Sequence, residues 1–337
     1  MSINIGVIGA GRIGKIHAEN LVTRISGANV PAIASLNIEE TRVVAENLNI
    51  PFVTDDYREI IHHPAIDAIA ICSSTDTHTE MMIEAAEAGK HIFCEKPIDF
   101  SLERIDAALK AVEKAGVRLQ IGFNRRFDAN FRRLRRAILK NEIGEPHLLH
   151  IISRDPAPPP IDYIKVSGGL FFDMTIHDFD MSRFLIGSEI SEIYARADVK
   201  VDPAIGEAGD IDTAVIMLRY ENGVIGTIDN SRRAVYGYDQ RAEVFGSGGA
   251  ARIENNYDNQ VIISNKVYIQ RDLPMYFFLE RYAQSYVDEL QAFINALEKD
   301  MEPPVKGIDG RVPVVMAMAA YKSLKENRPV KLSEVDR

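Results

Sequence analysis

The stretch Val7–Gly14, V-I-G-A-G-R-I-G, joins a short apolar run, Ile3–Ile8, to a segment of helical character that begins at Ile13. In such a turn the first glycine permits a sharp bend, the second lets the backbone approach a pyrophosphate, and the third lets the helix pack closely on the strand. The start of the helix offers free N–H groups and the positive end of the helix dipole to the phosphates. Strand, glycines and helix occur here in the required order, which predicts a dinucleotide site. The residues expected to line it are Gly9, Gly11, Arg12, Ile13 and Gly14.

Strand-like and helical segments alternate from the N-terminus to Gly122. Short apolar strands that alternate with helices are typical of a parallel sheet that is buried on both faces. After Gly144 the strand candidates follow one another without crossover helices, and Asn222-Gly223 has the sequence of a hairpin turn. We therefore predict an α/β Rossmann domain with a doubly wound parallel sheet over residues 1–122. An α+β domain with a large, mostly antiparallel sheet is expected over residues 123–337, with late helices that pack back on the first domain.

The bulk composition disfavours several classes of protein. The 337-residue chain is 46% hydrophobic and carries a formal net charge of −10, whereas a protein that coats nucleic acid carries an excess of positive charge. No apolar run is long enough to cross a bilayer, and the first residues lead directly into a strand rather than resembling a signal peptide. Cys72 and Cys94 both lie in apolar strand-like runs, which is typical of packing in a cytosolic protein. We therefore expect a cytoplasmic protein without a nucleic-acid or membrane partner.

A lysine follows another predicted strand, His91–Cys94, in the sequence Glu95-Lys96-Pro97. The carboxyl ends of strands in an open α/β sheet face the ligand crevice, so Lys96 is expected beside the bound cofactor, with Glu95 next to it. An ammonium group at this position stabilises a developing alkoxide and orients a hydroxyl group. Pro97 fixes the turn, with the 96–97 peptide a candidate for the cis form. The alternative interpretation is a lysine on an ordinary surface loop.

The segment Gly168–Gly187, G-G-L-F-F-D-M-T-I-H-D-F-D-M-S-R-F-L-I-G, has the composition of one helix rich in large apolar residues. Asp173, His177 and Asp180 are spaced i, i+4, i+7 and would share one face of that helix. A polar stripe on an apolar helix is costly unless it lines a cavity. Histidine titrates near neutral pH and a carboxylate one turn away orients its ring, so the pattern predicts a general base for a hydroxyl proton. The alternative is a buried His177 that Asp173 satisfies as a packing pair.

Other patterns carry weaker or negative evidence. Catalytic zinc needs three close ligands, and both cysteines are far in sequence from His177, so no metal site is expected. A nucleophile elbow, G-x-S-x-G, does not occur. A loop of small polar residues after another strand end is expected to touch the cofactor; it contains Ser73, Ser74, Thr75 and His78. Asp155 and Tyr236 lie in later loops and can add polar contacts to a substrate.

Six motifs are spread along the whole chain: G-A-G-R-I-G-x-x-H-A-E-N at 9–20, C-S-S-T-x-T-H at 72–78, F-C-E-K-P at 93–97, G-F-N-R-R-F-D at 122–128, S-R-D-P-A-P-P-P at 153–160 and D-M-T-I-H-D-F-D at 173–180. Together they resemble the glucose-fructose oxidoreductase/inositol dehydrogenase/rhizopine-catabolism (Gfo/Idh/MocA) family. Within that family the resemblance is strongest to bacterial myo-inositol 2-dehydrogenases.

The resemblance implies an NAD-dependent dehydrogenase that acts on a CH–OH group, with a catalytic trio of Lys96, Asp173 and His177. The expected reaction is the oxidation of myo-inositol to 2-keto-myo-inositol, in which His177 is the base, Lys96 stabilises the alkoxide and Asp173 orients His177. The residues that would bind the polyol beside the trio are Arg125, Asp155, Asp180 and Tyr236. The resemblance also implies that the C-terminal sheet builds a homo-oligomer, which is expected to be a tetramer.

One position departs from the family pattern. Many relatives place an acid about 20 residues past the glycines, where it binds the ribose 2′-hydroxyl of NAD. Ser35 stands there, and Arg12 in the glycine turn is placed to reach toward a 2′-phosphate. We therefore expect Ser35 in the cofactor site and measurable use of NADP beside NAD, because an acid that would repel the 2′-phosphate is missing.

The sequence leaves two alternative functions open. The same fold can serve another inositol isomer or a pyranose sugar, and some members of the superfamily bind the dinucleotide as regulators without chemistry. Retention of Lys96 and His177 favours an enzyme. The β-rich half is expected to leave one sheet face open, with Ala214, Ile216 and Leu218 on it, and a second subunit would cover this face.

Overall fold

The computed structural model describes residues 2–336 and divides into two compact units. Unit 1 contains the residues up to Phe127 together with Gln284–Val314, and unit 2 contains Asp128–Ala283 together with the residues from Val315 onwards. Helix α13 (Gly307–Glu326) contributes its first turns to unit 1 and the remainder to unit 2. No helix within residues 2–336 is long and apolar enough to span a membrane.

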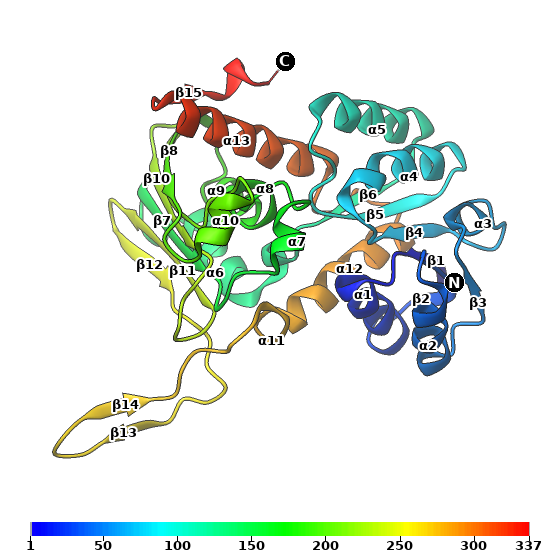
Figure 1. Cartoon of the computed structure of the whole chain (residues 1–337), viewed down its shortest axis with the longest axis horizontal. Helices are drawn as coiled ribbons and strands as arrows, with labels where there is room; N and C mark the ends of the chain where they lie inside the picture. The colour runs from blue at the N-terminus through cyan, green and yellow to red at the C-terminus, as the bar shows by residue number, and fades with distance from the viewer. Residues whose placement is uncertain (1, 337) are drawn as a thin grey trace. The chain divides into compact units, whose positions relative to one another are not determined.

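A six-stranded sheet forms the centre of unit 1 (Figure 1). Its strands are β1 (Ile3–Ile8), β2 (Ala28–Ala34), β3 (Phe52–Thr54), β4 (Ala68–Ile71), β5 (His91–Glu95) and β6 (Leu119–Gly122). Every neighbouring pair is parallel, in the order β3-β2-β1-β4-β5-β6. The chain starts at the centre of this sheet and moves outward in both directions, which is the doubly wound arrangement. The predicted Rossmann sheet is confirmed, and the short β3 is a strand that the sequence reasoning missed.

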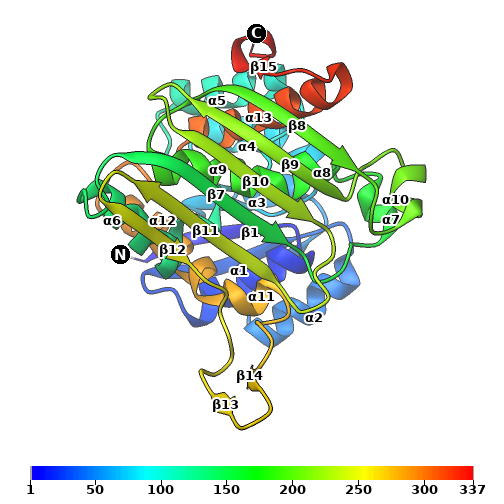
Figure 2. The ribbon, with the colours of Figure 1, turned by 90° about the vertical axis from the view of Figure 1, so that its left-hand side faces the viewer.

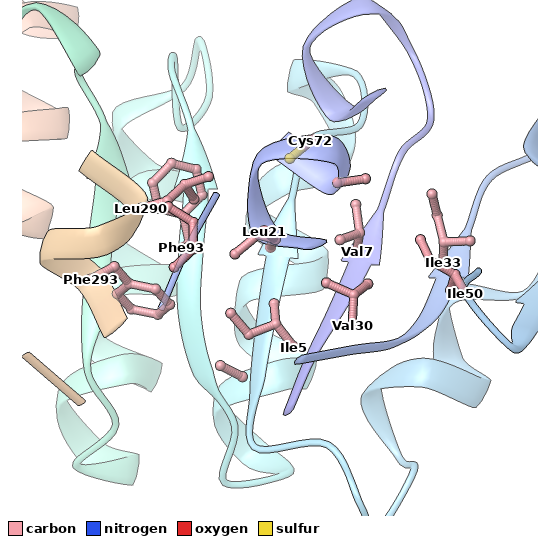
Figure 3. Packing of buried hydrophobic residues seen from close by; sticks show 14 of the residues in the cluster. Ile5, Val7, Leu21, Val30, Ile33, Ile50, Cys72, Phe93, Leu290 and Phe293 are labelled. Carbon is pink, nitrogen blue, oxygen red and sulfur yellow. The ribbon is translucent and has the colours of Figure 1, made fainter. Parts of the chain in front are cut away.

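Helices pack on this sheet and close its core. They are α1 (Arg12–Thr23), α2 (Ile38–Leu48), α3 (Tyr57–Ile61), α4 (Thr75–Glu87), α5 (Leu102–Ala115) and α12 (Ala283–Glu298), with a 3-10 turn over Asn124–Phe127. Leu21 of α1 and Leu290 and Phe293 of α12 join Val7 and Phe93 of the sheet in one buried cluster (Figure 3). The chain returns to unit 1 through α12, about 160 residues after leaving it, so this part of the core is made by segments far apart in sequence.

Unit 2 contains a seven-stranded sheet that is mostly antiparallel. Its strands are β7 (Pro146–Arg154), β8 (Ile190–Asp198), β9 (Thr213–Tyr220), β10 (Ile225–Ser231), β11 (Asp239–Gly246), β12 (Gly249–Ile253) and β15 (Val330–Lys331). Their order is β12-β11-β7-β10-β9-β8-β15, and β7 and β10 form the one parallel pair among these strands (Figure 2). The Asn222-Gly223 turn connects β9 to β10, as predicted. The predicted α+β character of the second half is therefore confirmed.

The two faces of this sheet differ in what covers them. Helix α9 (Thr175–Ile186) packs against β7 and β10. Ala214, Ile216 and Leu218 point to a covered face and are almost fully buried, so the expectation that they lie on the open face is wrong. The open face carries apolar residues that are each about half exposed: Leu148, Val215, Met217, Ile225 and Phe245. Strand β9 has apolar side chains on both faces, and alternation alone therefore could not show which face is covered.

Short helices and a hairpin complete unit 2. The helices are α6 (Ala129–Leu139), α7 (Ile161–Ile164), α8 (Leu170–Asp173), α10 (Pro203–Glu207) and α11 (Phe278–Arg281). The hairpin of β13 (Ile262–Ser264) and β14 (Ile269–Arg271) extends away from the seven-stranded sheet (Figure 1). All residues of its two strands are exposed.

Candidate active site

Each glycine after β1 is required for a different structural reason. Gly9 has φ +99°, and a Cβ there would lie 2.6 Å from the backbone of Cys72 and Ser73. A Cβ at Gly14 would overlap the carbonyl oxygen of Gly9, so this glycine allows α1 to pack on the turn. At Gly11, by contrast, a Cβ would meet no atom of the described chain within 4 Å. Packing therefore explains Gly9 and Gly14, and Gly11 is the glycine that leaves open space where a ligand can approach.

The start of α1 fits a dinucleotide phosphate. Gly11 is the N-cap, no side chain of the described residues caps it, and the first turn contains no acid. The N–H of Lys15 donates to the carbonyl of Gly11 at 3.0 Å and is the first bond of the helix, so the preceding N–H groups have no partner inside the helix. Ile13 and Gly14, which the sequence assigned to the cofactor together with Arg12, belong to this first turn. NAD bound here would contribute a nicotinamide that accepts a hydride.

Ser35 lies directly after β2 and is half buried, with its N–H donating to the carbonyl of Thr54 at 3.2 Å. The acids that follow it are engaged elsewhere. Glu40 pairs with Lys15 and accepts from Asn37 at 3.0 Å, and the bond to Lys15 lowers the pKa of Glu40. The structure therefore places a serine at the strand end itself, and Glu40 on the following helix is ion-paired with Lys15 of α1.

The loop after β4 places hydroxyl groups beside the start of α4. Ser73 shares a hydrogen bond of 2.7 Å with Thr77, Ser74 is the N-cap of α4, and Thr75 begins the helix. His78 is fully buried, with Nδ1 2.9 Å from the carbonyl oxygen of Pro97 and Nε2 3.1 Å from that of Ser73. Burial lowers the pKa of His78. The imidazole therefore joins the loops that follow β4 and β5.

Three strand ends meet at one edge of the parallel sheet of unit 1. Ile8 pairs with Ile71, and Ile71 pairs with Cys94, so the segments that begin at Gly9, Cys72 and Glu95 leave the sheet side by side. Lys96 follows Glu95 in this edge, is half buried and precedes a cis peptide to Pro97, as the sequence suggested. Arg125 lies in the 3-10 turn after the next strand, β6, and is buried.

In unit 2 the segment Gly168–Gly187 is not one helix. Helix α8 ends at Asp173, Met174 forms a turn, and α9 starts at Thr175, so Asp173 does not share a helix with His177 and Asp180. The prediction of one continuous helix is therefore wrong. At this break the buried hydroxyl of Thr175 bonds the carbonyl of Leu170 at 3.3 Å and Asn230 at 2.7 Å.

Asp173 is held from two sides. Its Oδ1 accepts from the hydroxyl of Tyr163 at 2.8 Å, and its Oδ2 accepts from Nη1 of Arg232 at 2.9 Å. Arg232 is 1% exposed, and Asp210 lies 3.8 Å from its Nη2. Burial opposes the charge of this guanidinium, but the neighbouring carboxylates, Asp173 first among them, raise the pKa of Arg232. Asp173 thus faces a permanently charged cation.

Arg232 is a residue that sequence reasoning missed. Strand β10 buries alternate residues, and this period of two continues past its end to Arg232, whereas the adjacent Arg233 is exposed. This alternation in the sequence could have predicted that Arg232 is buried. No pattern in the sequence indicated that the buried arginine would meet Asp173, because the two are 59 residues apart.

The remaining predicted substrate residues lie in different surroundings within unit 2. His177 is half buried in the first turn of α9, and its N–H bonds the carbonyl of Met174 at 3.3 Å. Asp180 is buried one turn later. The N–H of Asp155 donates to the carbonyl of Ser231 at 2.9 Å, directly after β7.

Tyr236 is partly exposed, and its hydroxyl is already engaged. It donates to Asp239 at 2.6 Å and accepts from Arg154 at 3.2 Å. Burial and the bond to Asp239 raise the pKa of Tyr236. The hydroxyl is therefore a fixed, neutral group in this part of unit 2.

Comparison with known proteins identifies the family. Residues 3–123 match a model described as an oxidoreductase family with an NAD-binding Rossmann fold, and residues 131–252 match the Gfo/Idh/MocA C-terminal domain. The chain is 50% identical to a myo-inositol 2-dehydrogenase of Thermotoga maritima over 99% of both chains. It is 44% identical to an inositol 2-dehydrogenase of Rhizobium meliloti over 99% of this chain and 100% of the relative.

A solved structure of an inositol dehydrogenase has the same fold as this chain. It is a scyllo-inositol dehydrogenase from Lactobacillus casei with bound NAD(H) and scyllo-inositol. This chain superposes on it with a TM-score of 0.93 at 31% identity, over 99% of this chain and 100% of that chain. From the glycine turn, the two sheets and these matches together, the chain belongs to the Gfo/Idh/MocA family of NAD-binding Rossmann-fold oxidoreductases.

Proposed function

We propose that this protein is an NAD-dependent dehydrogenase that oxidises a cyclic polyol, with myo-inositol as substrate and 2-keto-myo-inositol as product. The observation that carries the substrate class is the full-length similarity to enzymes named as inositol dehydrogenases, at up to 50% identity. The glycine turn of unit 1 supports the cofactor, because it combines an uncapped helix start with open space at Gly11. Removal of a hydride and a proton from the CH–OH group leaves the ketone.

The roles of the catalytic residues follow from their chemistry. Lys96 stabilises the negative charge that develops on the substrate oxygen as the proton leaves. His177 accepts that proton. Asp173 orients His177 and steadies its charge after protonation, and Arg232 and Tyr163 hold the carboxylate of Asp173 in place. The residues proposed to bind the remaining hydroxyl groups are Arg125, Asp155, Asp180 and Tyr236.

We further propose a division of labour and an assembly. Unit 1 binds the dinucleotide, and unit 2 supplies the base and most of the polyol contacts. Four copies form a cytoplasmic homotetramer in which the open face of the seven-stranded sheet is buried. The half-exposed apolar residues on that face support association, since such patches are uncommon on monomers.

The function is tested by measuring NAD and NADP reduction with a panel of myo-, scyllo- and chiro-inositol and several aldoses. Turnover that is highest with myo-inositol supports the proposal. Higher kcat/KM with another inositol isomer or a pyranose assigns that substrate instead. Tight NAD binding without turnover of any polyol would indicate a dinucleotide-binding regulator.

The assigned roles are tested by Lys96→Ala and His177→Ala. Each is expected to lower kcat at least about 100-fold, the usual scale for a lost electrostatic or acid–base contribution, while His177→Ala retains NAD affinity. In the wild type, kcat/KM should rise with pH as one group loses its proton, because the base must be unprotonated to act. Near-normal turnover of His177→Ala would remove it as the base.

A further inference from the structure

A buried cluster of titratable groups lies inside unit 1, next to Lys96. It consists of His17 on α1, Glu95 at the end of β5 and Glu289 on α12. His17 and Glu289 are fully buried and Glu95 is 8% exposed. The nearest side-chain nitrogen and oxygen atoms of the three residues all lie within 4.8 Å of one another. None of the catalytic steps described above uses His17 or Glu289.

The carboxylate of Glu95 uses both of its oxygens. Oε1 lies 2.6 Å from Nε2 of His17, and Oε2 accepts the backbone N–H of Lys96 at 3.2 Å. Gly122 makes room for this group, because a Cβ there would lie 3.0–3.1 Å from the carboxyl atoms. The second bond attaches the backbone of Lys96 directly to the buried carboxylate.

His17 is the donor in its bond to Glu95. Its ring packs edge-on against Phe93 and Tyr286, at centroid distances of 5.1 and 5.7 Å. Nδ1 is buried, and nothing in the described chain hydrogen-bonds it. A protonated imidazole would bury an unsatisfied N–H at this position, which is costly. The neutral ring that donates from Nε2 to Oε1 of Glu95 avoids that cost.

Glu289 is in a different state from Glu95. Neither of its carboxyl oxygens has a hydrogen-bond partner among residues 2–336. The titratable groups that face it are Glu95 of β5, His17 of α1 and the thiol of Cys72 after β4, and none of them is a cation. Burial, together with Glu95, raises the pKa of Glu289 well above its usual range. Burial and the neighbouring carboxylate therefore both favour the protonated form of its carboxyl group.

We propose that Glu95 is the positioning residue for Lys96, and that Glu289 is a neutral neighbour whose protonation leaves Glu95 as the single anion of the cluster. This inference rests on the role proposed above for Lys96. Two ionised carboxylates within 4.8 Å in a buried space would repel each other. With Glu289 neutral, Glu95 keeps both of its bonds, to His17 and to the N–H of Lys96.

Two nearly isosteric substitutions test the roles of the two carboxyl groups one at a time. Glu95→Gln removes the anion that accepts from both donors, and kcat is expected to fall at least about tenfold, since small misplacements of a catalytic group are costly. NAD affinity should stay within about threefold, and the primary deuterium isotope effect on kcat should rise because chemistry becomes slower. Glu289→Gln replaces a neutral acid by a neutral amide and should leave kcat within about twofold. A loss of folded enzyme would lower the measured rate without changing the isotope effect.

The pH dependence of stability provides a readout that does not depend on activity. In the unfolded chain Glu289 loses its proton near its ordinary pKa, whereas in the native protein it keeps it. The unfolded state of the wild type is therefore favoured increasingly as pH rises from about 4 to 8. Glu289→Gln lacks this pH-dependent contribution to the free energy of unfolding. Its melting temperature relative to that of the wild type should therefore rise by at least about 2 °C from pH 4 to pH 8, measured in chelator-treated buffer.

Each outcome decides between the interpretations. A Glu289→Gln protein whose melting temperature does not rise relative to that of the wild type between about pH 4 and 8 would overturn the neutral state. If chelator also destabilises the wild type and metal analysis finds one divalent cation per chain, the cluster is a metal site instead. If the wild type oxidises a polyol and Glu95→Gln has the same kcat and isotope effect as the wild type, the positioning role alone is overturned. A wild type that oxidises no polyol would overturn the proposed function and this role together.

Discussion

Asp173 depends on neighbours that come from other parts of unit 2. Tyr163 and Arg232 bind its two oxygens, and Arg232 is almost completely buried. Two hydrogen bonds from different residues, one of them from a charged guanidinium, limit the rotation of this carboxylate. Asp173 is therefore prepared to orient a histidine before any ligand binds.

We expect Arg232→Met to lower kcat at least about tenfold, because Asp173 loses the hydrogen bond that fixes its orientation. The substitution should also reduce stability by about 3–5 kcal/mol, the range for one partner removed from a buried pair. Steady-state kinetics and urea unfolding measure the two effects separately. Arg232→Lys keeps the charge and should recover part of the activity, although lysine cannot reproduce the planar guanidinium.

A matched control exists in the same unit. Arg281 pairs with Asp128 at 2.5 Å and is also buried, at 6% exposed, but neither residue belongs to the proposed catalytic set. Arg281→Met should cost similar stability and leave kcat within about threefold. Equal losses of kcat in both variants would mean that Arg232 acts only through stability.

At the scale of elements, the turn between β1 and α1 contains glycines with different functions. A Cβ at Gly14 would collide with the carbonyl of Gly9, while a Cβ at Gly11 would enter open space, and Gly11 has φ −69°, which alanine adopts easily. We predict that Gly11→Ala folds normally but binds NAD at least about tenfold more weakly. Gly14→Ala should lower the melting temperature. Thermal unfolding and NAD titration by fluorescence distinguish the two, and a Gly11→Ala protein with normal NAD affinity would show that the pyrophosphate lies elsewhere.

The prediction on cofactor choice depends on which residue stands at the carboxyl end of β2. Ser35 occupies the end of the strand, and Glu40 on the following helix is ion-paired with Lys15. We expect measurable NADP use by the wild type. Ser35→Asp should shift kcat/KM toward NAD by at least about tenfold, or 1.4 kcal/mol. Kinetics with both cofactors measure this, and a wild type that already rejects NADP by a factor of thousands would contradict the argument.

At the scale of the whole molecule, the open face of the seven-stranded sheet is the surface expected to drive assembly. Val215 and Met217 are 51% and 49% exposed on β9. If the proposed tetramer forms through this face, the double change Val215→Glu and Met217→Glu should shift it to smaller species, because it places charges in a face that would be buried. Light scattering coupled to size exclusion measures the mass. Val43→Glu on α2, where the valine is 56% exposed, serves as the control and should leave the mass unchanged.

The sequence by itself determined the features whose physics is local. A glycine turn between strand and helix, alternating elements and an Asn-Gly hairpin each depend on a few consecutive residues, and the Rossmann sheet and the antiparallel sheet follow from them. The positions of Gly9, Lys96 and Ser35 at strand ends were predicted for the same reason, since the carboxyl ends of parallel strands share one edge.

Only the tertiary structure decided the features that depend on distant partners. The bonds of Thr175 to Leu170 and Asn230 accompany a break in the expected helix at Met174, and Arg232 reaches Asp173 across 59 residues. Strand β9 is apolar on both faces, so its covered face depends on where the helices pack. The raised pKa of Glu289 likewise depends on burial in the core and on Glu95 of β5, which the sequence pattern does not contain because desolvation is a property of the assembled core.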